Sequence, residues 1–301
     1  MRDYLAHIAY SGRWRQIDHR PGDIVLSVPS KCGTTWTQML VALLIFDTAD
    51  LPAPLSELSP WIDMRTEPID ALRERIEAQT HRRFFKTHVP LDGLPLRPDV
   101  SYIVVGRDPR DAWVSMEHHL DNLDVPKALA QRCDDGAGDP EPWPDLPDEP
   151  KERFRAMLDR PVGSNHTNAH LAQVVHHLLT GWRRRHQPNV LLLHYADMKR
   201  DLPAALEQIA SFLGIERSPQ RLAELAEAAA LDAMRARAGE LAPNASADLW
   251  RDPAAFFRGG TSRSWAPWFT PATEAVYWRR VAELAPDEGF DAWLHRQSNR
   301  S

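Results

Sequence analysis

Apolar residues gather in four short runs along the chain, at residues 23–28, 84–88, 102–106 and 190–193. Short runs of this kind are typical of strands buried inside a parallel sheet. Between or after them, apolar residues recur at helical spacing over residues 35–46, 171–185 and 202–213. Strands that alternate with helices predict an α/β protein, with a central parallel sheet flanked by helices on both faces.

The composition is that of an ordinary globular enzyme, with 43% hydrophobic and 26% charged residues. A length of 301 residues suits one large domain or two modest ones. The formal net charge of -6 predicts that the protein has no nucleic-acid partner. A bound anion would therefore be held by a few locally placed groups.

Three features predict a cytoplasmic protein with no transmembrane segment. The two cysteines, Cys32 and Cys133, cannot form a disulfide framework and fit a reducing compartment. The longest strongly apolar run, residues 39–46, is too short to span a bilayer. The beginning of the chain has no apolar signal core.

One segment, residues 134–149, departs from this composition. It contains seven acidic residues, no basic residue and four prolines. Such a segment buries too little apolar surface to order itself strongly, which is typical of a solvated linker. A long loop in a compact domain is also often a lid, so a mobile lid over an acceptor pocket is the second interpretation.

The stretch VPSKCGTTW follows the first apolar run directly. A strand that ends in a tight turn before a helix points backbone N–H groups at one place, which makes an anion site. Lys31 adds a charge there, and Thr34 and Thr35 add hydroxyl donors. The Gly-Lys-Ser/Thr order of nucleoside triphosphate loops is absent, which argues against a Mg²⁺-nucleotide site.

A second segment, SYIVVGRDPRDAWVS, places Arg107 at the end of a predicted strand. Asp108 and Pro109 then begin a helix, and Ser115 follows two turns later. An arginine at the carboxyl end of such a strand projects into the crevice where open α/β sheets bind ligands. Its planar guanidinium suits a phosphate group.

Two further segments carry weaker signals. In RRFFKTHVP, His88 ends a strand beside Lys86, and histidine is the commonest general base. Alone, it would more often be a structural histidine. In FFRGGTSRSW, Arg258 precedes Gly259 and Gly260, whose backbone could approach a ligand closely. Alone, this stretch would equally fit a glycine turn.

Together these segments resemble the PAPS-dependent sulfotransferases of the cytosolic type, PAPS being 3′-phosphoadenosine 5′-phosphosulfate. The motifs PSKCGTTW, KTH, VVGRDPRDAWVS, LLLHYADMK and FFRGGTSRSW follow the family's order and span residues 28–270. The tripeptide SPW at residues 59–61 and the context HRRFFKTH are most similar to actinobacterial enzymes, including glycolipid-acting ones. The resemblance implies a single sulfotransferase domain over residues 1–301, with a P-loop-like sheet.

The resemblance also implies a role for each motif residue. The 5′-phosphosulfate would be held by Lys31, Cys32, Gly33, Thr34 and Thr35. The adenine would meet Trp36, Tyr195 and Leu231. The 3′-phosphate would be held by Arg107, Ser115 and Arg258 with the backbone of Gly259 and Gly260. His88 would act as general base, with Lys31 and Lys86 close to the transferring group.

The implied reaction moves a sulfuryl group from PAPS to a hydroxyl of an alcohol, phenol or glycolipid by in-line transfer. Such transfer depends on positioning and on stabilising charge, which lysines can supply, so no metal is expected. His166 and His170 lie four apart but have no third metal ligand in register. The alternatives are a P-loop-like kinase and a nucleotide-binding protein without turnover.

Several positions depart from the family pattern. Ala229 and Ala230 stand with Leu231 where the family has Thr-Ser-Phe, so two hydroxyl contacts to adenine are lost. The family's dimer motif would begin at Ala266 and end at Glu274, and its lysine and valine are missing, which leaves open a monomer or a dimer on another surface.

Cys32 replaces the family's usual serine. Its position beside Lys31 and at a helix start predicts a lowered thiol pKa. A buried, inert thiol is the alternative.

Overall fold

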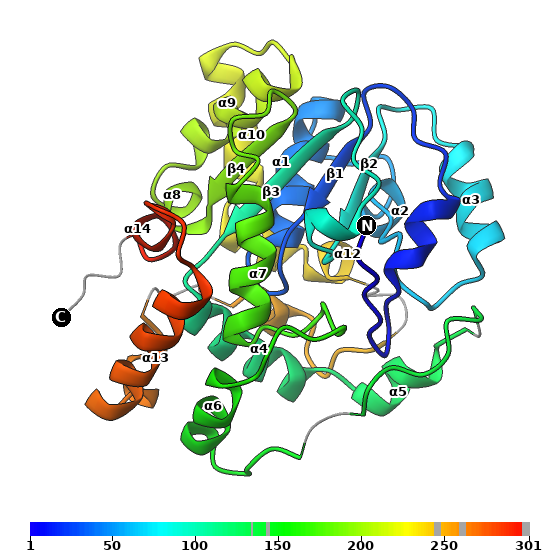
Figure 1. Cartoon of the computed structure of the whole chain (residues 1–301). Coiled ribbons are helices and arrows are strands. Elements are labelled where there is room, and N and C mark those ends of the chain that lie inside the picture. Colours follow the sequence, from blue (N-terminus) through cyan, green and yellow to red (C-terminus); the bar gives the residue numbers. More distant parts are fainter. Residues whose placement is uncertain (134, 143–144, 244–247, 259–262, 297–301) are drawn as a thin grey trace.

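The structure, a computed structural model, describes residues 1–133, 135–142, 145–243, 248–258 and 263–296. Within these residues a parallel sheet has four strands in the order β2-β1-β3-β4 (Figure 1). The strands are β1 (Ile24–Ser27), β2 (Phe84–Thr87), β3 (Ser101–Gly106) and β4 (Val190–His194). All four predicted strands are confirmed, and each bound differs from its prediction by no more than one residue.

The three predicted helices are also confirmed. They are α1 (Thr34–Phe46), α7 (Leu171–Trp182) and α9 (Leu202–Leu213). Helix α9 has the predicted bounds because its ends are well marked. Asp201 accepts a hydrogen bond from the amide of Ala204 at 3.0 Å, and Gly214 ends the helix with a left-handed φ of 66°.

Other helices fill the connections. The α-helices are α2 (Leu55–Leu58), α3 (Ile69–Glu77), α4 (Pro109–Asn122), α5 (Val125–Ala130), α6 (Pro150–Leu158), α8 (Tyr195–Arg200), α10 (Pro219–Ala228), α11 (Leu231–Ala236), α12 (Ala238–Leu241), α13 (Pro271–Leu284) and α14 (Phe290–Leu294). The 3₁₀-helices are η1 (Ser11–Gln16), η2 (Leu91–Gly93), η4 (Ala254–Phe256) and η5 (Ala266–Trp268).

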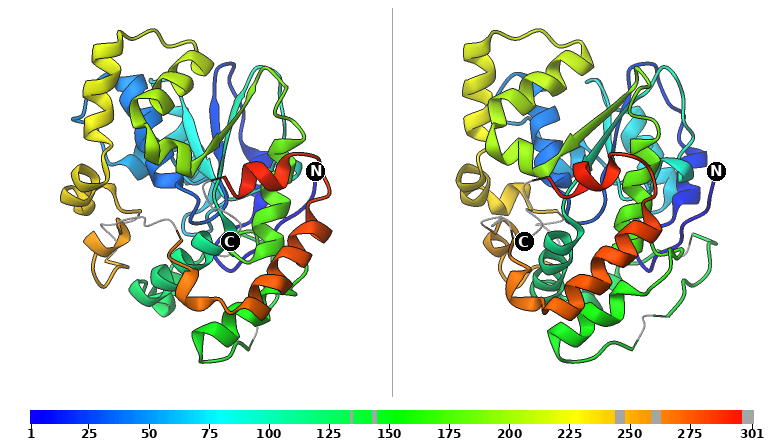
Figure 2. Two further views of the ribbon diagram at one scale, coloured as in Figure 1. Left: turned by 90° about the vertical axis from the view of Figure 1, so that its left-hand side faces the viewer. Right: turned by 60° about the vertical axis from the view of Figure 1, so that its left-hand side comes forward.

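Helices cover both faces of the sheet, as predicted. Helix α7 crosses the front of β3 in Figure 1, and α1 lies behind β1. Apart from Leu192, which is partly buried, the apolar residues of all four strands are buried between these layers. Helix α13 packs against α6 and α7, which closes the lower side of the molecule (Figure 2). The sheet is therefore a rigid core from which loops project at its carboxyl edge.

The strand order determines where a ligand can bind. Strand β1 pairs with β2 on one side and with β3 on the other. The chain therefore changes direction across the sheet between β1 and β3, and open α/β sheets bind ligands in the crevice at such a point. The loop after β1 and Arg107 after β3 both lie there. Asp108 begins α4 by accepting a hydrogen bond from the amide of Arg110 at 2.9 Å.

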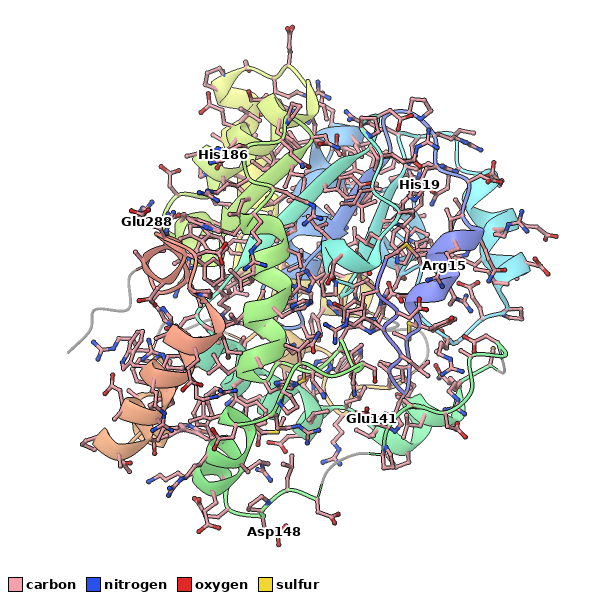
Figure 3. The ribbon with its side chains drawn as sticks, viewed as in Figure 1. Arg15, His19, Glu141, Asp148, His186 and Glu288 are labelled. Atoms are coloured by element: carbon pink, nitrogen blue, oxygen red, sulfur yellow. The ribbon has the colours of Figure 1, made fainter. Side chains whose placement is uncertain are left out.

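The described part of the acidic segment 134–149 contains no helix or strand. Its start is anchored, because the buried Arg65 donates hydrogen bonds to Asp135 at 2.9 Å and to the carbonyl oxygen of Gly138 at 3.1 Å. Further along, Glu141 and Asp148 are exposed (Figure 3). The lid remains a prediction, and any movement would begin beyond the Arg65 anchor.

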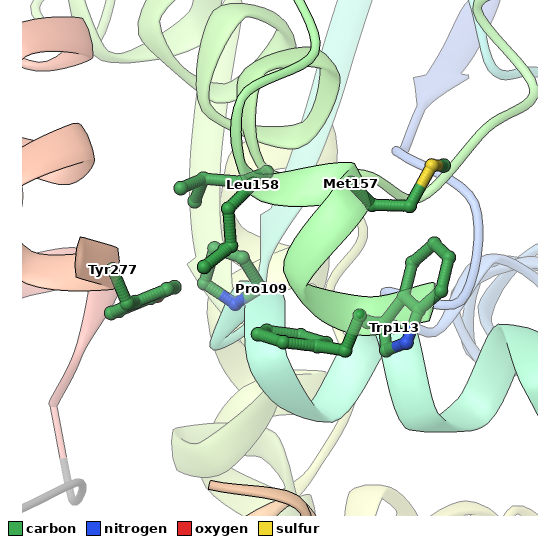
Figure 4. A pocket seen from close by; sticks show the side chains of 7 residues that line it. Pro109, Trp113, Met157, Leu158 and Tyr277 are labelled. Carbon is green, nitrogen blue, oxygen red and sulfur yellow. The ribbon is translucent and has the colours of Figure 1, made fainter. Parts of the chain in front are cut away.

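A small apolar pocket lies between α4, α6, α7 and α13 (Figure 4). It is lined by Pro109, Trp113, Phe154, Met157, Leu158, Leu171 and Tyr277. The indole Nε1 of Trp113 is buried with no hydrogen-bond partner in the part of the chain that the structure describes. Because the lining has no charged side chain, this pocket is a packing gap of the core and does not suit an anion.

Candidate active site

The loop between β1 and α1 has an unusual backbone. Lys31 has a φ of 65°, and Gly33, the N-cap of α1, has a φ of 102°. Both values lie in the left-handed region that glycine adopts most easily. A Cβ added at Gly33 would lie 3.0 Å from the ring of Tyr195, so the close approach also requires glycine.

The start of α1 offers unused hydrogen-bond donors. No side chain of the described residues caps this helix, so its first amide groups remain available to an anion. Thr34 and Thr35 are both buried, and the hydroxyl of Thr34 has no hydrogen-bond partner among the described residues. A buried hydroxyl without a partner costs about 1–3 kcal/mol, which a bound oxygen acceptor would offset.

Arg107 contacts both the loop between β1 and α1 and the ring of Tyr195 on α8. Its Nη1 donates a hydrogen bond to the carbonyl oxygen of Lys31 at 2.8 Å, and its guanidinium lies 4.5 Å from the ring centre of Tyr195. Arg107 is buried at the end of β3, so its charge acts in a site with little water. Ser115 lies on α4 and is partly exposed.

Positive charge accumulates around this loop. Burial, and then the charges of Arg107 and Lys86, lower the pKa of Lys31 to about 7. Burial lowers the pKa of Lys86 to about 8, and the negative charge of Asp63 opposes this shift. Cations that repel one another in a buried place are stabilised by a bound anion.

His88 is held in a defined tautomer. Its Nδ1 lies 2.6 Å from the carbonyl oxygen of Val28. A carbonyl oxygen can only accept, so Nδ1 carries the proton and the lone pair of the neutral ring is on Nε2. Burial, followed by the charge of Lys86, holds the pKa of His88 well below its usual value. The ring is therefore neutral near pH 7, as a general base must be.

Two aromatic residues face each other beside the loop. The rings of Trp36 and Tyr195 meet edge to face with their centres 5.4 Å apart. The indole of Trp36 donates to the carbonyl oxygen of Ala229 at 2.8 Å, which connects this pair to the chain just before α11. Leu231 begins α11 and packs against the core. The predicted adenine residues thus lie in neighbouring segments.

The last predicted segment is described only in part. Arg258 is exposed, and its charge contributes to a lowered pKa of His118 on α4. Gly259 and Gly260 lie outside the described residues. Arg258 therefore stays a predicted phosphate ligand.

The predicted low pKa of Cys32 is wrong. Its side chain is fully buried, and burial raises the pKa of the thiol to about 12, although Arg107 and Lys31 act in the opposite direction. Desolvation of the thiolate outweighs the neighbouring charges. The alternative of a buried, inert thiol is the one that holds.

Sequence reasoning missed the partner of Lys31. The ammonium nitrogen of Lys31 lies 3.1 Å from Nδ1 of His119. Burial and the charge of Lys31 keep the pKa of His119 well below its ordinary value, so the neutral ring accepts this hydrogen bond. The signal was present, because His119 lies four residues after Ser115 and so on the same face of α4.

His166 and His170 do not lie on one helix. The segment before α7 is irregular, His166 contacts Asp63 at 2.9 Å, and His170 is the N-cap of α7. No group of three or more His, Cys, Asp or Glu side chains arranged to hold a metal occurs among the described residues.

The described helices also include none that is long and apolar enough to cross a membrane.

Comparison with known proteins identifies the family. Residues 21–284 match the family described as "Sulfotransferase domain". The chain therefore belongs to the sulfotransferase family, and the resemblance predicted from the motifs is confirmed. The alternative of a P-loop-like kinase is wrong, because the matched family is that of the sulfotransferases.

Similar proteins include curated relatives from two mycobacteria. The chain is 44% identical over 308 residues to a "Glycolipid sulfotransferase" of Mycobacterium bovis (strain BCG / Pasteur 1173P2), covering 97% of this chain and 93% of that protein. The figures are the same for a "Glycolipid sulfotransferase" of Mycobacterium tuberculosis (strain ATCC 25177 / H37Ra).

Solved structures confirm the fold. A mouse sulfotransferase SULT7A1 complexed with PAP matches with a TM-score of 0.70 at 22% identity, covering 95% of this chain and 93% of that one. A retinol dehydratase in complex with androsterone and the inactive cofactor PAP matches with a TM-score of 0.68 at 22% identity, covering 94% and 88%. The P-loop-like sheet of the sulfotransferases is therefore the fold of this protein.

Proposed function

We propose that this protein transfers a sulfuryl group from PAPS to a hydroxyl group, in the cytoplasm, with glycolipids as the leading acceptor class. The observation that carries the proposal is a cluster of cations around the uncapped start of α1, of which Lys86 and Arg107 are buried and Lys31 is partly buried. Lys31, Lys86 and Arg107 form this cluster, and the neutral His88 lies beside it. The free thiols of Cys32 and Cys133 support a reducing compartment.

The donor's 5′ end fits the start of α1. The amide groups there, with the hydroxyls of Thr34 and Thr35, would hold the phosphosulfate oxygens. Arg107, Ser115 and Arg258, together with the backbone of residues 259–260, would hold the 3′-phosphate. The ring pair of Trp36 and Tyr195 would receive the adenine, with Leu231 behind it.

His88 and the two lysines perform the transfer. Nε2 of His88 takes the proton of the acceptor hydroxyl while the acceptor oxygen bonds to sulfur. The bond between sulfur and the donor's bridging oxygen breaks, and its electron pair leaves on the 5′-phosphate. Lys31 and Lys86 stabilise this growing negative charge. Each lysine must be protonated to do so.

Aromatic residues surround the side where the acceptor would enter. The ring of Trp61 meets His88 with centres 4.9 Å apart, and Trp250 meets His119 at 5.0 Å. The ammonium of Lys31 lies 4.9 Å from the ring centre of Phe256. Aromatic walls with a few placed polar groups suit a largely apolar ligand. Together with the mycobacterial relatives, they favour a glycolipid over a small phenol.

A transfer assay tests the proposal. Sulfur-labelled PAPS is incubated with the protein and, separately, with a glycolipid, a long-chain alcohol, a sterol or a simple phenol. We expect label in the glycolipid, and transfer about 10²–10⁴-fold slower with the His88→Ala variant. A preference for the phenol would overturn the acceptor class alone. A folded protein that binds the product PAP (3′-phosphoadenosine 5′-phosphate) but transfers no label to any acceptor would overturn the enzyme activity.

A further inference from the structure

A buried carboxylate lies behind the proposed transfer site. Asp63, between α2 and α3, is 0% exposed. Its two oxygens are contacted by four side chains from separate segments of the chain. These are Thr87 at 2.6 Å, Trp61 at 2.8 Å, His166 at 2.9 Å and Trp14 at 3.3 Å. A buried carboxylate needs such partners, and here they join η1, β2 and the segment before α7.

Trp61 connects Asp63 to both reactive side chains, Lys86 and His88. Its indole Nε1 donates to Asp63, which fixes the plane of the ring. The ammonium nitrogen of Lys86 lies 4.3 Å from the ring centre, and the ring of His88 meets it edge to face at 4.9 Å. The position of Trp61 is therefore coupled to Lys86 by a cation–π contact and to His88 by ring packing.

Thr87 provides a second connection. It stands between Lys86 and His88 in the sequence, and its hydroxyl donates to Asp63. The same oxygen accepts a hydrogen bond from the amide of Val89 at 2.9 Å, so it fixes the chain on the far side of His88. The amide of Lys86 donates to the carbonyl oxygen of Pro60 at 3.0 Å, which ties the Trp61 segment to β2.

The charge of Asp63 acts on the same two side chains. It raises the pKa of Lys86 and of His88 against the effect of burial. Among the described residues, the titratable groups that interact with Lys86 or His88 include Lys31 at the loop before α1, His119 on α4 and His166 beside Asp63. Arg107 and Cys32 interact with Lys31.

We propose that Asp63 is a positioning residue for sulfuryl transfer. It holds Trp61 and Thr87 so that Lys86 and His88 face the reacting groups, and its carboxylate provides a negative charge behind both side chains. This inference rests on the proposed function, because it assigns Asp63 to that same site.

The test compares three variants. Asp63→Asn keeps the shape and removes the charge. Thr87→Val removes the two hydrogen bonds of the Thr87 hydroxyl, to Asp63 and from the amide of Val89, and leaves the charge. Asp23→Asn is the matched control, since Asp23 is equally buried and paired with Arg83 at 2.6 Å near the start of β1. Thermal unfolding and calorimetry with PAP establish for each variant that the fold and the donor site persist.

For Asp63→Asn we expect kcat to fall on the order of 10²-fold, as misplaced catalytic groups do. Of the two alkaline pKa values in the profile of kcat/KM for PAPS, the upper one, which belongs to Lys86, should fall by about one unit or more, because an opposite charge close to Lys86 has been removed. Thr87→Val should lower kcat without moving the alkaline limb. Asp23→Asn should lower the melting temperature and move neither quantity.

An Asp63→Asn protein that binds PAP and has the wild-type pH profile and kcat would overturn the proposal. If Asp63→Asn does not fold, Thr87→Val decides, and unchanged kcat in that variant would overturn the positioning role. Failure of the proposed function would be recognised separately. In that case the wild-type protein itself would show no transferase activity, and so no pH profile of kcat/KM.

Discussion

The carbonyl oxygen of Val28 lies 2.6 Å from Nδ1 of His88, which leaves Nε2 as the proton acceptor of the neutral ring. The contact crosses from the end of β1 to the end of β2, so the sheet itself orients the proposed general base. Burial, followed by the charge of Lys86, lowers the pKa of His88 against the effect of this hydrogen bond, so the ring stays neutral near pH 7.

Replacing His88 by alanine should lower kcat by about 10²–10⁴-fold, the usual effect of losing a general base. PAP affinity should change little, because His88 is not among the residues proposed to hold the donor. Turnover with saturating acceptor and calorimetry with PAP measure the two quantities. Full turnover in this variant would show that another group takes the proton.

Cys32 should resist alkylation near neutral pH. Its thiol is buried and its pKa is raised to about 12, whereas Cys133 is only partly buried. Mass spectrometry of peptides after timed alkylation should find label on Cys133 first, with or without PAP present. A Cys133→Ser variant serves as the control for total labelling. Labelling of Cys32 at the rate of Cys133 would contradict the burial.

PAP binding should take up protons at pH 7.5 to 8. The pKa of Lys31 is lowered to about 7 and that of Lys86 to about 8 in the free protein, so each is partly uncharged there. A bound anion favours the charged forms, raises both pKa values and draws protons from the buffer, so affinity falls as pH rises. Calorimetry in HEPES and in Tris, whose enthalpies of ionisation differ, should give different heats of binding.

The Lys31→Met variant should lose much of that buffer dependence while keeping the length of the side chain. Equal heats in the two buffers for the wild-type protein would contradict the lowered pKa values of the lysines.

Within the region of the family's dimer motif, Thr270 caps a helix of this chain. Thr270 accepts a hydrogen bond from the amide of Thr273 at 3.2 Å as the N-cap of α13. Thr270→Ala should therefore lower the free energy of unfolding by about 1 kcal/mol. Light scattering should find the same mass as for the wild-type protein. Dissociation of a dimer in this variant would show that the old interface still operates.

Local features of the sequence predicted the elements and the chemistry but not the contacts between them. The strand of residues 23–28 and the helix of residues 202–213 are marked by their own residues, so both were found within a residue. Arg107 follows β3 directly and Lys31 lies in the loop after β1, and the parallel sheet brings such ends together.

Long-range contacts explain what was missed. The pKa of Cys32 depends on burial, which comes from layers far away in the sequence and outweighs the adjacent Lys31. Asp63 and His166 are 103 residues apart, and no local pattern relates them. Their juxtaposition arises only when the segment before α7 packs beside β2.

The central claim is that two anion sites hold one nucleotide: the start of α1 for the 5′ end, and Arg107 with Ser115 for the 3′-phosphate. Charge-assisted hydrogen bonds contribute roughly 1.5–3 kcal/mol each, so the 3′-phosphate should raise affinity by more than about tenfold. Calorimetry with PAP and with AMP, without added metal, measures this directly.

Arg107→Ala should remove most of the difference in affinity between the two nucleotides. Arg97→Ala, an exposed arginine paired with Asp99 near the opposite end of β3, should retain it. Tighter binding of PAP than of AMP, lost only in Arg107→Ala, is the predicted result. Equal binding of the two nucleotides by the wild-type protein, or binding that requires Mg²⁺ and ATP, would contradict the account.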